Sequence, residues 1–188
     1  MSGVSDSFGR RILSSPDGKE IWSHLLATAM TAAELCRVAQ MRAADEAFSC
    51  GLLHDIGKLI LLRADAPCYS EILAKGERVG NLLEVEQRAF GFDHAELGAA
   101  AAVSWELPGA VSHMIRFHHE PKQATAGLAL AHTLHTADTL VHLKEKDLPM
   151  SGFLNSGSVE TFGLTAIQFD TIWDTVSAKL NEVTTAFV

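Results

Sequence analysis

Apolar side chains recur at helical spacing along most of the chain. From Lys19 to Arg42 they return every three or four residues, as on the buried face of an amphipathic helix. The same pattern predicts helices over residues 43–63, 68–75, 82–90, 93–107, 108–120 and 124–146, and a terminal helix that opens at Thr165. No run alternates Val, Ile or Thr with polar residues, so we expect an all-α fold.

Local signals place several helix ends. Asn81 precedes Glu84 by three residues, and Asp93 precedes Glu96 by three, which is the capping-box spacing at a helix start. Gly91 is expected to close the helix between these two boxes. Residues 148–163, with Pro, Gly, Ser and Asn, are predicted to form a loop. We expect residues 1–18 to be an N-terminal extension and residues 19–188 to form a single domain.

Composition and charge exclude several classes of protein. The 188 residues are 47% hydrophobic and 20% charged, as in globular chains. The longest stretch without charged residues, Gln123–Ala137, is too short to span a membrane, and the first fifteen residues lack the apolar core of a secretory signal. A cytoplasmic location is therefore expected. The net charge of −8 argues against binding of duplex nucleic acid, and three cysteines without a CxxC pair argue against a disulfide framework or a thiolate zinc site.

The strongest chemical signal is the stretch GLLHDIGK, residues 51–58. It places an imidazole, His54, beside a carboxylate, Asp55, in the most apolar part of a predicted helix, where an unpaired Asp would be costly. Gly57 leaves room for another backbone, and Lys58 adds a cation one turn from His54. These residues suit a phosphate held beside a metal ion. The alternatives are a buried hydrogen bond between His54 and Asp55, or an ion pair between Asp55 and Lys58.

Further histidines and carboxylates follow in a distinctive order. The order reads His24, His54, Asp55, His94, His118, His119 and Asp138. It resembles that of the HD superfamily. Residues 86–98, together with the motifs Trp105–Pro108 and Phe117–Pro121, more closely resemble the HDOD family, which is related to the HD-GYP phosphodiesterases. The resemblance covers about residues 21–141 and implies a helical bundle with a metal site between helices.

The resemblance also implies one or two divalent ions. One would be held by His24, His54, Asp55 and Asp138, and the second by His94, His118 and His119, with Asp55 bridging to it. Imidazole and carboxylate ligands without thiolate suit Fe, Mn, Zn, Co or Ni. Asp55 and Lys58 would be the catalytic pair, and Lys58 would neutralise a phosphate oxygen. The Gly-Tyr-Pro stretch of the related diesterases is absent after His119, where residues 120–124 read EPKQA.

Each candidate ligand also has a purely structural explanation. His24 could be a hydrogen-bonded core residue, and His94 an exposed residue of a first helical turn. Asp138 could pair locally with His135 or His142 on its own helix. Neighbours on a helix point about 100° apart, so only one residue of the pair 118–119 is expected to be a firm ligand.

Two functions follow from the resemblance. The first is a bacterial signal-transduction output module that carries a metal site. Its partner would be a signalling protein or a phosphorylated small molecule such as a nucleotide. The alternative is an active metal-dependent phosphohydrolase that acts on a nucleotide or another phosphoester.

Overall fold

The helices form where apolar residues recur at helical spacing. The computed structural model describes residues 14–154 and 162–186, and these residues contain helices and no strand. The all-α prediction is thus confirmed. The chain divides into two compact units: unit 1 contains residues up to Ser23 and His54–Arg116, and unit 2 contains His24–Leu53 and residues from Phe117 onward. None of the described helices is long and apolar enough to cross a membrane.

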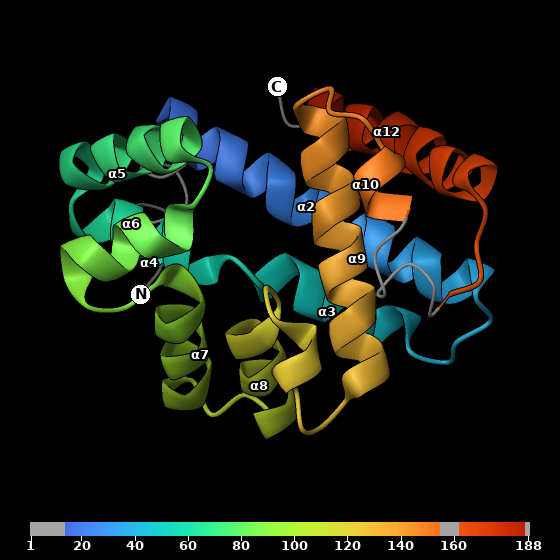
Figure 1. Cartoon of the computed structure of the whole chain (residues 1–188), viewed down its shortest axis with the longest axis horizontal. Helices are drawn as coiled ribbons and strands as arrows, with labels where there is room; N and C mark the ends of the chain where they lie inside the picture. The colour runs from blue at the N-terminus through green and yellow to red at the C-terminus, as the bar shows by residue number, and fades with distance from the viewer. Residues whose placement is uncertain (1–13, 155–161, 187–188) are drawn as a thin grey trace. The chain divides into compact units, whose positions relative to one another are not determined.

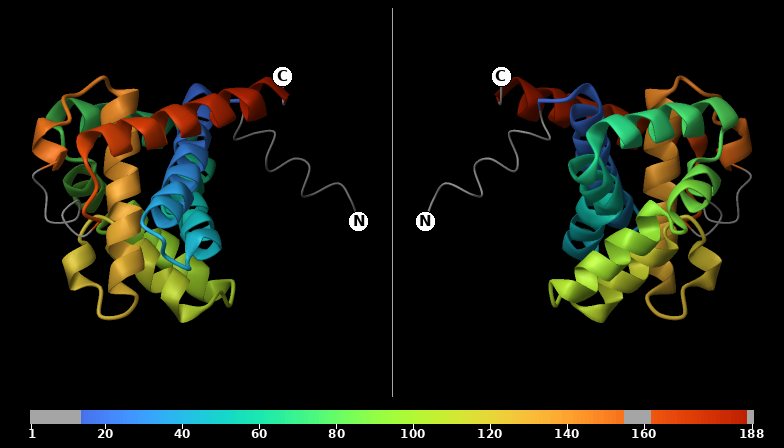
Figure 2. Two further views of the ribbon diagram at one scale, coloured as in Figure 1. Left: turned by 90° about the vertical axis from the view of Figure 1, so that its right-hand side faces the viewer. Right: turned by 90° about the vertical axis from the view of Figure 1, so that its left-hand side faces the viewer.

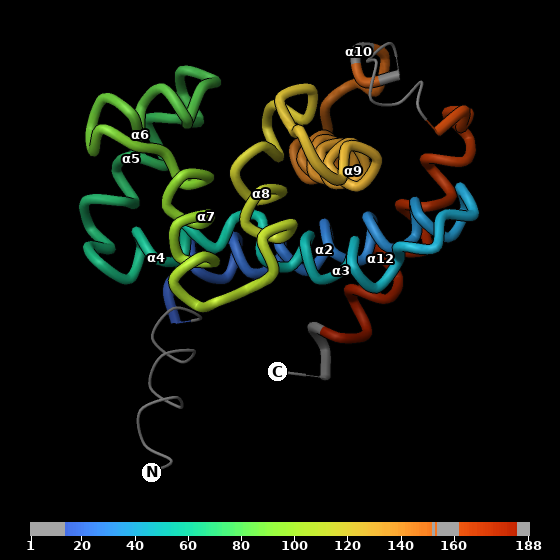
Figure 3. Tube along the Cα trace, turned by 90° about the horizontal axis from the view of Figure 1, so that it is seen from below, coloured from blue at the N-terminus to red at the C-terminus, as the bar shows by residue number. Residues whose placement is uncertain are grey.

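Unit 1 is built mainly from consecutive short helices. They are α4 (Ile56–Ala64), α5 (Ala66–Val79), α6 (Leu82–Phe90), α7 (His94–Ser104) and most of α8 (Gly109–Phe117), preceded by the first turns of α2 (Pro16–Val38). Helix α5 packs against α6 and α4, and α4 packs against α7. Figures 1 and 3 show α5 and α6 side by side. This packing brings the start of α7 next to the start of α4.

The predicted caps of unit 1 are confirmed. The Asn81 side chain accepts a hydrogen bond from the backbone N–H of Glu84 at 3.1 Å, and Gly91 closes α6 with a φ of 81°. A left-handed φ of this kind favours glycine. Asp93 and Glu96 form a complete capping box at the start of α7. The box fixes the first turn of α7, which carries the next residue, His94.

Unit 2 contains longer helices around a continuous apolar core. Its helices are the remainder of α2, α3 (Ala44–Leu53), the short η1 (Pro121–Gln123), α9 (Leu128–Glu145), α10 (Ser151–Leu154) and α12 (Ala166–Ala186). Leu35 of α2, Leu140 of α9 and Phe169 of α12 meet in this core. Phe153 of α10 stands edge-on to Phe169, with ring centroids 5.2 Å apart. Figure 2 shows α12 crossing α9.

Two glycines allow close approach of backbones, one in each unit. A Cβ added to Gly57 in unit 1 would lie 2.0 Å from the carbonyl oxygen of His94. A Cβ added to Gly51 in unit 2 would lie 2.6 Å from the Cα of Ala29. Neither distance is compatible with a side chain unless the backbone moves. Gly57 therefore sets the spacing between α4 and α7, as the sequence predicted for a close approach at this position.

Several predicted boundaries were wrong. The helix expected over residues 43–63 is two helices, α3 and α4, separated by a turn at His54 and Asp55. Helix α8 ends at Phe117, so His118 and His119 lie beyond its end. The predicted loop over residues 148–163 contains α10, and residues 155–161 lie outside the described part. Helix α2 begins at Pro16, within the predicted extension, whose first thirteen residues also lie outside the described part. The single-domain assignment stays a prediction.

Candidate metal centre

Asp55 lies in the turn before α4 and directs its carboxylate at three basic groups. Its side chain is 1% exposed, and its φ of −102° with no capping bond leaves the carboxylate available for side-chain partners. One oxygen, Oδ2, accepts a hydrogen bond from Lys58 and lies 3.4 Å from Nε2 of His54. The other, Oδ1, lies 3.1 Å from Nε2 of His94. The ion pair between Asp55 and Lys58 is therefore present, but it is one part of a larger cluster.

His94 is held by Glu86, a residue that the sequence analysis did not select. The ring nitrogen Nδ1 of His94 lies 2.7 Å from Oε2 of Glu86, and the backbone N–H of His94 donates to the same oxygen at 2.9 Å. Oε1 of Glu86 accepts a hydrogen bond from the Tyr69 hydroxyl at 2.5 Å. Glu86, His94 and Tyr69 are each at most 1% exposed. The alternative explanation of His94, as an exposed residue of a first helical turn, is thus wrong.

Opposing influences set the protonation of His94. Burial lowers the pKa of His94, and the nearby Lys58 lowers it further. Asp55 and Glu86 raise it by charge and hydrogen bonding, and the balance leaves the pKa above its ordinary value of 6.5. Burial, followed by Glu86, also raises the pKa of Tyr69, so this hydroxyl keeps its proton. In unit 1, the charges of two buried carboxylates are thus balanced by groups that donate to them.

Unit 2 contains a second histidine between two carboxylates. Nε2 of His24 lies 2.9 Å from Oδ1 of Asp138, and Nδ1 lies 2.9 Å from Oε2 of Glu145. The side chains of His24 and Asp138 are 13% and 15% exposed, and that of Glu145 is 30% exposed. Asp138 therefore pairs with a residue of another helix rather than only within α9.

The remaining candidate histidines of unit 2 follow α8. His118 is fully buried, whereas His119 is partly exposed. Their ring centroids lie 3.9 Å apart, and a nitrogen of one lies within 4.8 Å of a nitrogen of the other. Nδ1 of His135 lies 2.9 Å from the carbonyl oxygen of His118. The two neighbours face a common region because they are not constrained to the 100° steps of a helix.

The structure thus brings the candidates together in groups within each unit. Unit 1 joins His54, Asp55, Lys58 and His94; unit 2 joins His24 with Asp138, and His118 with His119. Sequence analysis missed Glu86 and Glu145 as members of the groups. Glu86 follows the buried Val85 and lies one turn after the apolar Leu82, and Glu145 lies seven residues, or two turns, after Asp138. The available signal was a carboxylate at helical spacing with an apolar residue or with a candidate ligand.

Comparison with known families shows the family to which the chain belongs. A family model for the HDOD domain matches residues 1–121. The chain belongs to the HDOD family. A curated "Uncharacterized protein" of Treponema pallidum (strain Nichols) is 33% identical to this HDOD chain over 119 residues, which make up 58% of the chain and 22% of that protein.

Solved structures have the same fold as this HDOD chain. A "Putative phosphohydrolase" from Shewanella amazonensis SB2B is 25% identical, with a TM-score of 0.65 over 85% of the chain and 59% of that structure. An HDOD domain protein of unknown function from Geobacter sulfurreducens is 21% identical, with a TM-score of 0.67 over 88% and 60%. The MmoQ response regulator from Methylococcus capsulatus str. Bath is 27% identical, with a TM-score of 0.61 over 81% and 59%. The chain thus spans about three fifths of these structures.

Proposed function

We propose that this chain is a bacterial regulatory HDOD module that binds a divalent metal ion and acts in cytoplasmic signal transduction. The observation that carries the proposal is the buried group of unit 1, in which Nε2 of His94 faces Asp55 while Nδ1 is held by Glu86. Histidine ligands in metal sites typically donate their other ring N–H to a carboxylate in this way. The likeness to a response regulator supports a signalling role.

The donor chemistry of both units fits a metal ion. Imidazole nitrogens and carboxylate oxygens suit Fe, Mn, Zn, Co or Ni, and the three cysteines occur in neither group. The candidate ligands are Asp55 and His94 within unit 1, and His24 and Asp138 within unit 2. Such an ion would act as a Lewis acid toward a bound phosphate oxygen.

Several candidate ligands lie, along the chain, near the points where it passes from one unit to the other. The chain passes between the units after residues 23, 53 and 116. His24, His54, Asp55 and His118 each lie within two residues of one of these passages. We propose that His54 and the pair His118 and His119 complete the ligand set that the family resemblance implies.

Lys58 gives the chain a second candidate function, that of a metal-dependent phosphohydrolase. Its ammonium group contacts Asp55, and its side chain is 17% exposed, so it has partial access to solvent. A cation there would bind a phosphate oxygen of a nucleotide or another phosphoester, and a similar solved protein is named a phosphohydrolase. In the regulatory function, the same groups would bind a phosphorylated ligand without turnover.

Elemental analysis of the full chain tests the metal assignment. The chain is purified without chelator, as wild type and as Asp55→Ala, with Asp45→Ala as a matched control because Asp45 is exposed at the start of α3. We expect near-stoichiometric metal in the wild type and in the control, and its loss from Asp55→Ala with the helical circular dichroism retained. Equal metal content in all three proteins would overturn the assignment.

A substrate screen separates the two functions. Metal-loaded protein is incubated with cyclic dinucleotides, nucleoside phosphates and an aryl phosphate, beside Lys58→Met. The regulatory function predicts binding without turnover. Turnover that disappears in Lys58→Met would instead establish the phosphohydrolase.

A further inference from the structure

One arrangement occurs independently in both units. In unit 1, His94 lies between Asp55 at Nε2 and Glu86 at Nδ1. In unit 2, His24 lies between Asp138 at Nε2 and Glu145 at Nδ1. In both cases an aspartate faces Nε2 and a glutamate faces Nδ1. Both aspartates belong to the proposed ligand set and neither glutamate does.

We infer that Glu86 and Glu145 are positioning residues that fix which ring nitrogen of His94 and His24 faces the metal. The inference rests on the proposed function. An ionised carboxylate offers only acceptors, so a ring nitrogen that hydrogen-bonds to it carries the hydrogen. By the same rule, Nε2 of each ring donates to its aspartate in the ion-free chain. When a metal ion takes the place of that hydrogen, each glutamate would keep the hydrogen on Nδ1 and leave Nε2, on the aspartate side, as the ligating nitrogen.

Both carboxylate oxygens of Glu86 accept hydrogen bonds within unit 1, and these bonds hold its side chain in place. Its Oε2 accepts from both the ring and the backbone of His94, which restrains the rotation of the imidazole relative to α7. Its Oε1 accepts from the Tyr69 hydroxyl of α5. Tyr69, Glu86 and His94 thus form a chain of hydrogen bonds from α5 through α6 to α7. Loss of such an outer partner typically weakens metal affinity by about 10–100-fold.

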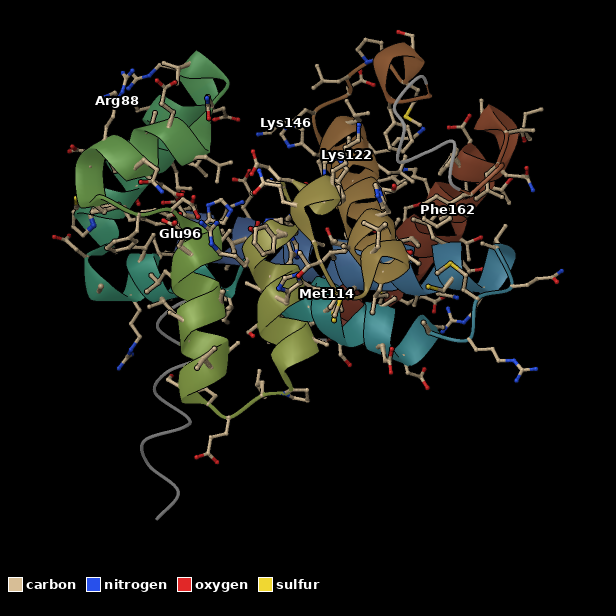
Figure 4. All side chains as sticks on the ribbon, turned by 60° about the horizontal axis from the view of Figure 1, so that its bottom comes forward. Arg88, Glu96, Met114, Lys122, Lys146 and Phe162 are labelled. Atoms are coloured by element: carbon tan, nitrogen blue, oxygen red, sulfur yellow. The ribbon has the colours of Figure 1, made fainter. Side chains whose placement is uncertain are left out.

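Zinc titration of the full chain tests the inference. Zn²⁺ affinity is measured against a chelating indicator for wild type, Glu86→Gln and Glu145→Gln. Glutamine keeps the side-chain size and an acceptor oxygen but removes the charge. The controls are Glu84→Gln on α6, whose partner Arg88 points outward in Figure 4, and Glu182→Gln on α12, which is exposed. We expect about a 10-fold or greater loss for the first two variants and no change for the controls.

Long-range ¹H–¹⁵N NMR reports which ring nitrogen of each histidine carries the hydrogen. A loss of stability alone would not change that assignment. In the zinc-loaded wild type, the spectra of His94 and His24 should show a protonated Nδ1 and a metal-bound Nε2. Glu86→Gln should change the ring signals of His94 and leave those of His24, and Glu145→Gln should do the reverse. Tyr69→Phe retains Glu86 and should weaken zinc binding less than Glu86→Gln. It tests the same chain of hydrogen bonds if Glu86→Gln does not fold.

The outcomes separate this inference from the proposed function. If the wild type binds zinc, Asp55→Ala loses it and both glutamine variants keep wild-type affinity, the positioning role is wrong while the metal site stands. Ligation through Nδ1 in the wild-type spectrum would likewise overturn the positioning role. If the wild type binds no zinc and elemental analysis finds no other divalent metal, the proposed function itself fails.

Discussion

Both units contain a histidine between an aspartate and a glutamate, but they differ in burial. The group of unit 1 is at most 1% exposed, and a tyrosine supports its glutamate. The group of unit 2 is between 13% and 30% exposed. Burial removes water as an alternative partner, so the donors and acceptors of the unit 1 group depend on one another. The unit 2 group can exchange a lost partner for water.

Because of this difference, substitutions in the two groups should lower the free energy of unfolding to different extents, even where both weaken metal binding. A buried group that is already rigid requires little reorganisation when a ligand binds. A partly exposed group tolerates substitution better, because water can replace a lost partner. We expect substitutions in unit 1 to affect both stability and metal binding. Matching substitutions in unit 2 should affect mainly metal binding.

Replacing the two glutamates by alanine should give the largest contrast. Glu86→Ala leaves the Tyr69 hydroxyl and two N–H groups of His94 buried without their acceptor, and we expect the free energy of unfolding to fall by about 3–5 kcal/mol. Glu145→Ala should cost less than about 1 kcal/mol, because its ion pair is partly exposed. Urea denaturation of both proteins measures the two values. Equal losses would contradict the comparison.

Alanine at the two close-approach glycines should have the next largest effect. The added methyl group should lower the free energy of unfolding by about 1–3 kcal/mol at Gly57 and at Gly51. Only Gly57→Ala presses on the backbone of His94, so it alone should also weaken zinc binding. Gly109→Ala is the control, since nothing lies within 4 Å of the added atom. Denaturation and zinc titration check both parts, and a zinc defect confined to Gly51→Ala would oppose the prediction.

The glutamates also show what the sequence could predict and what it could not. Helices capped by Asn81 and Asp93 follow from local hydrogen-bonding rules that act within one turn. The break at His54 and Asp55 was missed because the apolar pattern continues through it. Glu86 was missed because its partners are separated from it by 8 and 17 residues. The helical period does not reveal such partners, so the only signal for Glu86 was a carboxylate at helical spacing with apolar residues.

Tyr69→Phe should produce a smaller, pH-dependent effect. At neutral pH the lost hydrogen bond should cost about 1–2 kcal/mol. Burial and Glu86 raise the pKa of Tyr69 above its ordinary value of 10, so the folded chain keeps a proton that the unfolded chain releases. The stability from this residue is therefore fully present below pH 10 and falls as the pH rises further.

Absorbance spectroscopy checks this prediction, because Tyr69 is the only tyrosine in the sequence. The signal of ionised tyrosine should develop only together with unfolding. The wild type should also lose stability above pH 10 more steeply than Tyr69→Phe, by up to about 1.4 kcal/mol per pH unit. Ionisation of the tyrosine in the folded chain near pH 10 would refute the assignment.

The smallest expected difference between the units lies in the reactivity of their cysteine thiols. Cys36 and Cys50 of unit 2 are buried, and burial raises the pKa of both thiols, that of Cys50 to about 12. Cys68 of unit 1 is exposed. Because the thiolate is the reactive form, a thiol reagent at pH 8 should modify one cysteine per folded chain rapidly. Mass spectrometry should find the label on Cys68, and rapid labelling of Cys50 would be inconsistent with its burial.

The central proposal is that this HDOD chain binds divalent metal and that Asp55 and Asp138 are both ligands. The most direct test is the metal content per chain of the wild type, Asp55→Asn and Asp138→Asn, measured side by side after loading with zinc and removal of the excess. The account predicts near-stoichiometric zinc in the wild type and a large loss in each variant, with helical content preserved. A wild type without zinc, or a variant of either unit that keeps the full amount, would contradict it.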